Sequence, residues 1–247
     1  MSGYIQDLIN RMNDRSYRAG EVKKIDIYES SKTVAWLAMD EARGLKDENT
    51  LQDLYALLNN NLEESVKQNI YFAIGYITKN TQNHEAIDFL LHSLKKEKES
   101  FTLVTILNRL EEIFKPKSID LKNIVDLNNH RNWHVRCSSY LALTNSELNR
   151  ETYLAELLST KEKEDDIVYL LRALGYIGTA KSIPVIESVT KTRKTKIKQN
   201  AFETMAIIML RENYEIKEIV KKTKCSESYL NTIVSRLHLL SRIKPSY

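Results

Sequence analysis

Residues 128–139, which read NNHRNWHVRCSS, are the most chemically varied stretch of the sequence. Two histidines four residues apart do not make a zinc site without further ligands at suitable spacing, so we predict no metal site here. Trp133 is interpreted as either a half-buried residue or an exposed contact anchor. Arg136 is interpreted either as a structural residue or as a cation that faces a partner. We keep both residues as candidates for partner binding.

Basic residues are concentrated in the last quarter of the chain. Residues 181–247 carry 14 basic and 6 acidic side chains, whereas residues 1–180 carry 23 and 27. Such an asymmetry favours an acidic protein partner or a polyanion over a neutral one, although a solvated basic turn has the same composition. The candidate partner-binding cations in the densest segment, KTRKTKIKQN, are Lys191, Arg193, Lys194, Lys196 and Lys198.

Further candidates lie on the predicted helices before this segment. Arg136, Arg172 and Lys198 fall near the starts or middles of three successive helices, so we expect a ladder of cations along one surface. Tyr169 is a candidate aromatic anchor beside them, because tyrosine combines a large apolar body with a polar tip.

Signals for catalysis are absent from the sequence. There is no glycine-rich phosphate loop, no Cys/His metal framework and no Gly-x-Ser-x-Gly nucleophile motif, so we predict no enzyme activity, no cofactor and no small-molecule substrate. Asp165 and Asp166 are adjacent, stand just before a predicted helix, and are interpreted as residues that cap it and favour its positive end. Two cysteines, no N-terminal signal and no long apolar run favour a cytoplasmic protein that does not span a membrane.

The elements that would position these residues follow a helical pattern, clearest in residues 165–188. Ile167, Leu170 and Leu174 recur at three- and four-residue steps and predict one apolar helix face. Gly175 is expected to allow a close backbone approach, and Gly178 to end the helix in a left-handed conformation. Pro184 then fits the first turn of the next helix.

Similar helices recur along the chain at intervals of 30–35 residues. A second, shorter amphipathic segment precedes each of the later ones, at residues 51–58, 86–94, 119–127, 153–158 and 183–189. A repeating unit of two helices is typical of an α-solenoid, in which neighbouring units bury each other's apolar faces. The predicted starts lie near Val34, Val66, Phe101, Val135, Ile167 and Ile197.

The segments LRALGYIGTAKSIPVIES and NWHVRCSSYLAL resemble HEAT repeats of the short type, and the resemblance covers roughly residues 30–210. It implies an all-α fold: a right-handed α-solenoid of about six hairpins whose second helices line a concave side. It implies no activity. We expect a single domain over residues 1–247, with an N-terminal cap at 1–30, HEAT-like repeats at 31–212 and C-terminal capping helices at 213–247. Residues 22–28 are expected to complete the irregular first unit.

The C-terminal tail resembles the helix-turn-helix of bacterial regulators over residues 218–236. That resemblance implies that Ser226, Ser228, Tyr229 and Asn231 would lie near DNA bases, with Lys221, Lys222 and Lys224 near phosphates. Lys224 stands where the family usually has glycine. A plain helical hairpin that caps the solenoid explains the same apolar spacing.

These observations predict a noncatalytic scaffold or adaptor that binds a protein with an acidic surface. An assembly factor and an immunity protein that neutralises a toxin fit the same pattern. The alternative is a nucleic-acid-binding protein that uses the basic C-terminal region. HEAT-like alkylpurine DNA glycosylases are a minor alternative, because their family uses tryptophan and aspartate around the lesion and this chain offers only Trp36 and Trp133 as tryptophans.

Overall fold

The computed structural model describes residues 3–18, 20 and 29–243, with side chains described up to residue 235. These residues form fourteen α-helices and three short 3-10 helices, and no strand occurs among them. Two isolated bridges, between Tyr17 and Thr33 and between Lys115 and Ser146, are the β-type pairings of the described chain. The all-α class predicted from the sequence is confirmed. The predicted segment 22–28 lies outside the described residues.

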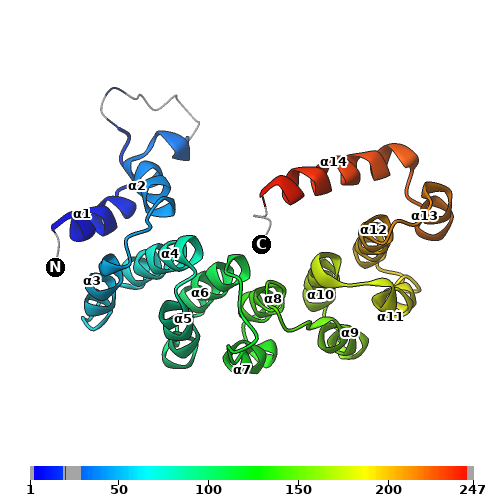
Figure 1. The fold of residues 1–247 in the computed structure, drawn as a ribbon, viewed down its shortest axis with the longest axis horizontal. Coiled ribbons are helices and arrows are strands. Elements are labelled where there is room, and N and C mark those ends of the chain that lie inside the picture. The colour runs from blue at the N-terminus through cyan, green and yellow to red at the C-terminus, as the bar shows by residue number, and fades with distance from the viewer. Residues whose placement is uncertain (1–2, 19, 21–28, 244–247) are drawn as a thin grey trace. The chain divides into compact units, whose positions relative to one another are not determined.

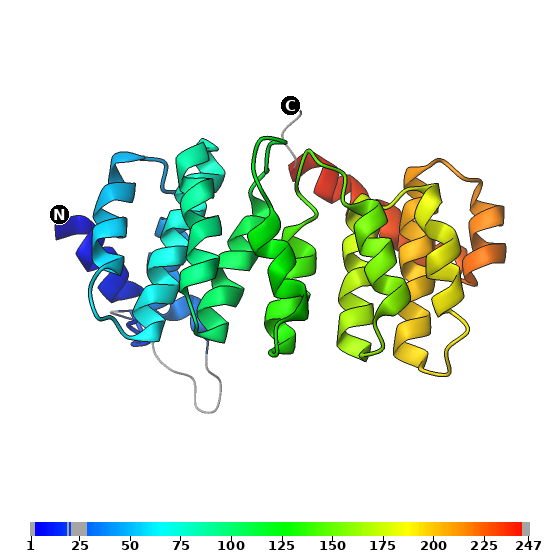
Figure 2. The ribbon, with the colours of Figure 1, turned by 90° about the horizontal axis from the view of Figure 1, so that it is seen from below.

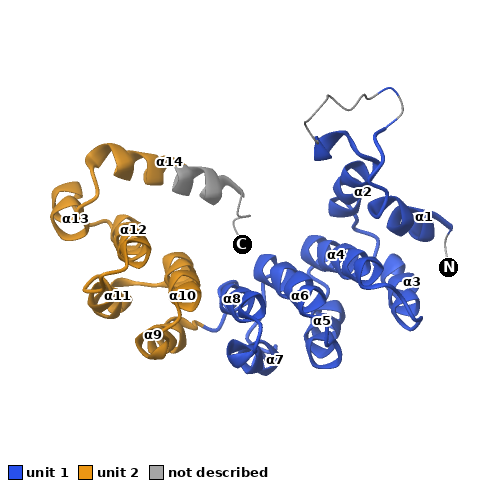
Figure 3. Ribbon diagram, turned by 180° about the vertical axis from the view of Figure 1, so that it is seen from behind, with its two compact units in different colours: residues 1–148 blue, residues 149–247 orange. Residues whose placement is uncertain are grey.

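The chain folds into two compact units, residues 1–148 and residues 149–247 (Figure 3). We describe each unit by itself, and the single continuous domain remains a prediction. From the full sequence, unit 1 carries 19 basic and 21 acidic side chains, whereas unit 2 carries 18 and 12. The positive charge of the protein therefore belongs to unit 2.

Unit 1 is built from helices in two layers (Figure 1). One layer contains α2, α4, α6 and α8, which pack successively against one another. The other contains α3, α5 and α7, each packed against the first layer, while α1 contacts α2, α3 and α4. The helices are α1 (Gly3–Met12), α2 (Val34–Arg43), α3 (Asn49–Leu58), α4 (Glu64–Thr81), α5 (His84–Lys96), α6 (Ser100–Glu112), α7 (Lys122–Val125, continued by the 3-10 helix Asp126–Asn129) and α8 (Trp133–Ala142).

Unit 2 repeats this arrangement. Helices α10 and α12 pack against each other, α9 packs against α10 and α11, and α11 packs against α12. Both remaining helices, α13 and α14, contact α12. Figure 2 shows the helices of the unit lengthwise. They are α9 (Glu151–Thr160), α10 (Glu164–Ile177), α11 (Ile183–Val189), α12 (Thr195–Arg211), α13 (Ile216–Thr223) and α14 (Glu227–Ile243), with 3-10 helices at Ser30–Lys32 in unit 1 and Ala180–Ser182 in unit 2.

The apolar stripes read from the sequence form the cores of the two units. In unit 1, Ile70 and Ile74 of α4 and Ile106 of α6 are fully buried, as are Leu170 and Leu174 of α10 in unit 2. Burying a side chain of this size contributes about 1.5–3 kcal/mol. Because each stripe recurs at helical spacing, the predicted helices lie within a few residues of the observed ones.

Two glycines of α10 behave differently from the prediction. Gly178 has an extended backbone, with φ −64° and ψ 149°, so it is not a left-handed helix end. Glycine is needed there for space, because a Cβ would lie 2.6 Å from the Leu174 carbonyl oxygen. At Gly175 the nearest neighbours of a Cβ would be side chains, Thr204 at 3.9 Å and Ile207 at 4.0 Å, and not a backbone. The predicted place of Pro184 in the first turn of a helix is confirmed in α11.

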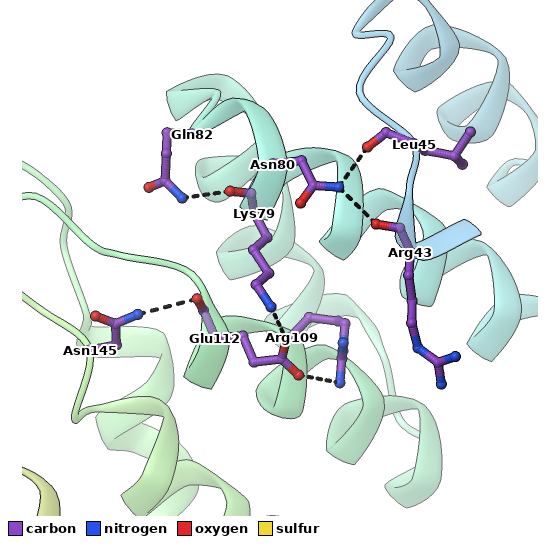
Figure 4. Close-up of polar contacts among 8 residues, drawn as sticks. All are labelled: Arg43, Leu45, Lys79, Asn80, Gln82, Arg109, Glu112 and Asn145. Atoms are coloured by element: carbon purple, nitrogen blue, oxygen red, sulfur yellow. Dashed lines mark hydrogen bonds and ion pairs between the residues drawn. The ribbon is translucent and has the colours of Figure 1, made fainter. Parts of the chain in front are cut away.

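Side-chain hydrogen bonds connect the end of one hairpin to the end of the next, at sequence separations of 33–37 residues. Asn80 Nδ2 donates to the carbonyls of Arg43 and Leu45, 37 and 35 residues earlier (Figure 4). Asn145 Nδ2 donates to the carbonyl of Glu112, 33 residues earlier. These bonds satisfy carbonyls at helix C-termini that have no partner within the helix. In unit 2, Arg211 makes the equivalent hydrogen bonds: its guanidinium donates to the carbonyls of Gly175, Tyr176 and Gly178.

None of the described helices combines the length and the apolar character that crossing a membrane requires.

Candidate interaction surfaces

Five predicted site residues form one exposed cluster in unit 2, which we call the basic surface. They lie on the turn after α11 and in the first turn of α12. Ile197 in this turn is buried, so the helix is fixed by an apolar contact while the residues on either side face solvent. The basic surface consists of Lys191, Arg193, Lys194, Lys196 and Lys198, all of them exposed.

The start of α12 carries three lysines, Lys194, Lys196 and Lys198. It has no acidic residue in its first turn, and Lys194 at the N-cap makes no capping side-chain hydrogen bond. The partial positive charge of a helix N-terminus favours acidic side chains by about 0.3–1 kcal/mol each and disfavours basic ones. The neighbouring helix α10 follows the usual preference, with Glu164, Asp165 and Asp166 in its first turn. The acidic start of α10 is as predicted, although its N-cap is a lysine without a capping side-chain bond.

One carboxylate of α10 reaches the basic surface. The Nζ atoms of Lys194 and Lys196 lie 3.9 and 3.8 Å from the carboxylate oxygens of Glu164. Both lysine side chains keep more than half of their surface exposed, so these long ion pairs contribute little to stability. Among the described residues, Lys191, Arg193 and Lys198 form no ion pair. Most of the charge of the basic surface is therefore available to a partner.

Two other predicted site residues lie farther along α10. Arg172 is exposed, and its Nε donates to the hydroxyl of Tyr176 at 3.2 Å, with the guanidinium 5.8 Å from the centre of that ring. Tyr169 is half-buried. Because Arg172 follows Glu164 by eight residues, it lies about 12 Å along the helix from the carboxylate that meets the basic surface.

The remaining two predicted site residues, Arg136 and Trp133, belong to unit 1. Arg136 is 5% exposed, and its Nη1 donates to the carbonyls of His130 at 2.9 Å and Arg131 at 3.2 Å. The guanidinium thus closes the turn that precedes its own helix. The prediction that Arg136 faces a partner is wrong, and it cannot form the first step of a ladder with Arg172 and Lys198. Its structural role is local, within one hairpin.

Trp133 begins an exposed row of three rings at the starts of α6 and α8. Its ring stacks on His134 with centroids 3.6 Å apart, and His134 lies 6.3 Å from Phe101. Trp133 is 39% and Phe101 59% exposed. The sequence predicts a helix start near Phe101, which α6 confirms, but the exposure of this ring was not predicted. The sequence feature that indicates this exposure is the position of Phe101 directly after the polar turn LKKEKES, where a helix start projects beyond the core.

The structure also contains a cation cluster that sequence reasoning missed. Arg109 lies across Gly75, where a Cβ would come within 2.3 Å of its Cγ. Its guanidinium stacks 4.6 Å from the ring of Tyr76 and 5.2 Å from that of Phe72. Lys79 and Arg109 both bind Glu112, at 2.7 and 2.8 Å (Figure 4). These cations of unit 1 are occupied by contacts within the unit.

The tail forms the helix, turn and helix expected of residues 218–236. Lys224 adopts a left-handed conformation with φ 58°, so the tight turn forms with lysine in the place of glycine. Ser226 Oγ accepts a hydrogen bond from the Tyr229 amide at 3.3 Å, which fixes the start of α14. The side chains that the resemblance places near bases and phosphates are all exposed: Ser226, Ser228, Tyr229, Asn231, Lys221, Lys222 and Lys224.

Groups able to hold a metal ion are not found in the described part of the chain, where no three His, Cys, Asp or Glu side chains converge. Cys137 is buried and Cys225 is half-buried, both as free thiols. Comparison of the sequence with models of known protein families and with curated proteins gave no match.

Proposed function

We propose that this chain is a noncatalytic binding module, a HEAT-like right-handed α-solenoid of about six hairpins, which binds an acidic segment of a protein partner through the basic surface. The recurring contacts between hairpin ends, at intervals of 33–37 residues, support the solenoid. The start of α12 carries the functional part of the proposal. Lysines at a helix N-terminus lower the stability of the helix. Residues that lower stability are commonly retained where they serve binding, so these lysines support a binding role.

The neighbouring charges favour a short acidic segment over a long polyanion. Glu162, Glu164 and Asp165 stand at the start of α10, and Glu164 contacts two lysines of the basic surface. A nucleic-acid backbone carries regularly spaced charges and needs a continuous basic track. These carboxylates would repel such a backbone, whereas a few acidic side chains can fit among Lys191, Arg193 and Lys198. An adaptor, an assembly factor and an immunity protein would all use such a surface.

The test compares two triple charge reversals for binding to a labelled polyglutamate peptide. In the first variant, Lys194, Lys196 and Lys198 are replaced by glutamate. The control replaces Lys95, Lys96 and Lys98, three exposed lysines at the end of α5 and in the turn after it, and so has the same net charge. We expect the first variant to bind about tenfold or more weakly, as for a loss of roughly 1.4 kcal/mol, and the control to bind like the wild type.

A loss of stability cannot explain that result. The first variant places glutamate at the N-terminus of α12, where it stabilises the helix, whereas the control places glutamate at the C-terminus of α5, where it does not. Equal weakening in both variants would show an effect of net charge alone. Unchanged binding in the first variant would remove the basic surface from the proposal.

Double-stranded DNA is the second candidate ligand, because the turn at Lys224 forms and leaves the start of α14 exposed. Here the tail, and not the basic surface, would make the contact. Binding to a random-sequence duplex would be measured between about 50 and 200 mM salt for the wild type and for Asn231→Ala with Lys224→Ala. Binding that persists at the higher salt and is lost in the double variant would favour this function. No binding of the wild-type protein at the lower salt, or equal binding by the double variant, would exclude it.

A further inference from the structure

Lys115, in the segment after α6, is a fully buried lysine that the proposed function does not use. Its side chain is 0% exposed and is among the largest fully buried side chains of the protein. Lysine is almost never fully buried unless its charge is compensated, because transfer of an ammonium ion from water to the interior is costly. Lys115 therefore needs either a charge partner or a neutral amine.

The hydrogen bonds of Lys115 fit the neutral amine. Its Nζ donates to the carbonyl of Leu110 at 2.6 Å and to that of Ile113 at 2.8 Å. A neutral amine has two N–H donors, and both then have a partner. An ammonium ion has three donors, so one N–H would need an acceptor beyond these two carbonyls. A buried donor without an acceptor costs about 1–3 kcal/mol, and more when it is charged.

Two acidic residues close to Lys115, Glu112 and Glu147, bind other groups. Glu112 of α6 binds Lys79 and Arg109, and the Glu147 carboxylate accepts the backbone N–H of Lys117. On α8, Arg136 and Tyr140 bond to backbone carbonyls of the preceding turn. Burial lowers the pKa of Lys115 to about 7, and the charge of Glu111, which acts in the opposite direction, only partly offsets it.

The backbone of Lys115 joins two connections of unit 1. Its N–H donates to the carbonyl of Asn145 at 3.0 Å, and its carbonyl accepts the N–H of Glu147 at 2.9 Å. The Asn145 side chain adds a bond to the end of α6, and Lys117 bonds to Glu147. The connection after α6 is thus closed against residues 145–147, and the Lys115 amine lies at this junction.

We propose that Lys115 is a proton-controlled latch: the junction between the end of α6 and residues 145–147 closes with the Lys115 amine buried and neutral, and uptake of one proton from water opens this junction. The opened lysine is solvated and charged, so opening consumes one proton and breaks no covalent bond. The device is separate from the basic surface, which belongs to the other unit. The latch makes the equilibrium between the closed and the opened junction of unit 1 depend on pH.

The direction follows from the two protonation states. Burial holds the pKa of the closed form at about 7, below the ordinary value of 10.5. Between these values the opened form binds one more proton than the closed form, so the closed form gains stability as pH rises. The opening constant should fall by about tenfold per pH unit in this window. Below pH 7 both forms carry the proton, and the constant levels off.

The direct test is an NMR titration of the full-length wild-type protein with 13C- and 15N-labelled lysine. We expect one lysine, assigned to Lys115 by its loss in Lys115→Met, to titrate near pH 7. If Lys115 titrates near the ordinary value of 10.5, the proposal is overturned. The wild-type titration decides this by counting resonances that move near pH 7, even if the variant does not fold.

Local opening is tested by amide hydrogen exchange at pH 7.5 and 9.0, corrected for the intrinsic rates. We expect the protection of the Lys115 and Glu147 amides to rise about thirtyfold over this interval, as for one proton over 1.5 pH units. The Gln82 amide, which bonds to the Thr78 carbonyl at the end of α4, is the control and should not share this rise. Equal changes at all three amides, or none at Lys115 and Glu147, would contradict a latch.

Discussion

The two units use their charged side chains in opposite ways. Three cations of unit 1 are directed inward: Lys115 is fully buried, Arg109 lies over two rings, and Arg136 closes a turn. In unit 2 the buried charged residues are acids, Glu151 and Asp166, while the five cations of the basic surface stay exposed. Lysine is thus not confined to the surface of this protein by default. The exposure of the basic surface is a property of its position at the start of α12.

The buried groups Lys115 and Glu151 differ in whether their neighbours offset the desolvation of the charged form. For Lys115 desolvation prevails and lowers the pKa. Glu151 is surrounded by donors: the Thr179 amide at 2.7 Å, the Thr179 hydroxyl at 3.0 Å and the Ser182 hydroxyl at 2.6 Å. Desolvation raises its pKa, but hydrogen bonds from Ser182 and Thr179 and the charge of Lys181 together outweigh it, so the pKa of Glu151 lies below its ordinary value.

The largest effect is expected for Glu151→Gln, which leaves this buried ring of donors without a charged acceptor. We predict a loss of about 3 kcal/mol at pH 7, the upper range for hydrogen bonds to a charged group. Because the folded pKa is depressed, the stabilisation is present above the ordinary pKa of 4.5 and is lost as pH falls through the folded value. Urea unfolding at pH 7 and pH 4 should therefore show a smaller difference at pH 4. Glu156→Gln, on the exposed side of the same helix, is the control; a pH-independent difference for Glu151→Gln would contradict the account.

The next prediction concerns the same sequence pattern in both units, AIGYI at residues 73–77 and ALGYI at residues 173–177. Gly75→Ala should destabilise unit 1 by about 2 kcal/mol, because the new Cβ forces Arg109 away from Tyr76 and Glu112. Gly175→Ala should stabilise unit 2 by about 0.5–1 kcal/mol, because its Cβ fits and alanine favours the helix. Thermal unfolding of the two variants should thus shift in opposite directions. A shift of the same sign in both would show that the close contact at Gly75 relaxes without cost.

The smallest effects compare the two helix starts of unit 2. Replacing Lys196 and Lys198 by glutamate should raise stability by about 0.3–1 kcal/mol per residue, since acidic side chains suit the start of α12. Replacing Glu164 and Asp165 by lysine should lower stability by a similar amount. Urea unfolding at low salt measures both changes, and they should shrink at high salt. If the lysines of α12 prove stabilising, the claim that binding keeps them there loses its support.

Sequence patterns were sufficient for features that depend on neighbours along the chain. The helices follow from apolar residues at three- and four-residue steps, and the fit of Pro184 to a first helical turn follows from its fixed backbone angle. The exposed cations of the basic surface were likewise predicted, because charged residues between helices face solvent. The solenoid, its repeat number and its partner remain predictions.

Features that depend on distant segments could not be read from the sequence. Lys115 stands in an ordinary polar stretch, FKPKS, and is buried because residues 145–147 lie against it. Gly75 and Arg109 are 34 residues apart and meet only when α4 packs on α6. Arg136 failed as a predicted surface cation for a local reason, because its acceptors are carbonyls of the turn five and six residues before it.

The most direct test of the proposed function is an NMR titration of the wild-type protein with a short polyglutamate peptide at near-physiological salt. Amide signals are followed for the basic surface and for Lys95, Lys96 and Lys98, exposed lysines that lie beside Glu97 and Glu99 at a helix C-terminus. The account predicts saturable shifts that are concentrated at residues 190–198. Equal shifts at the two groups of lysines, or shifts absent from residues 190–198, would contradict it.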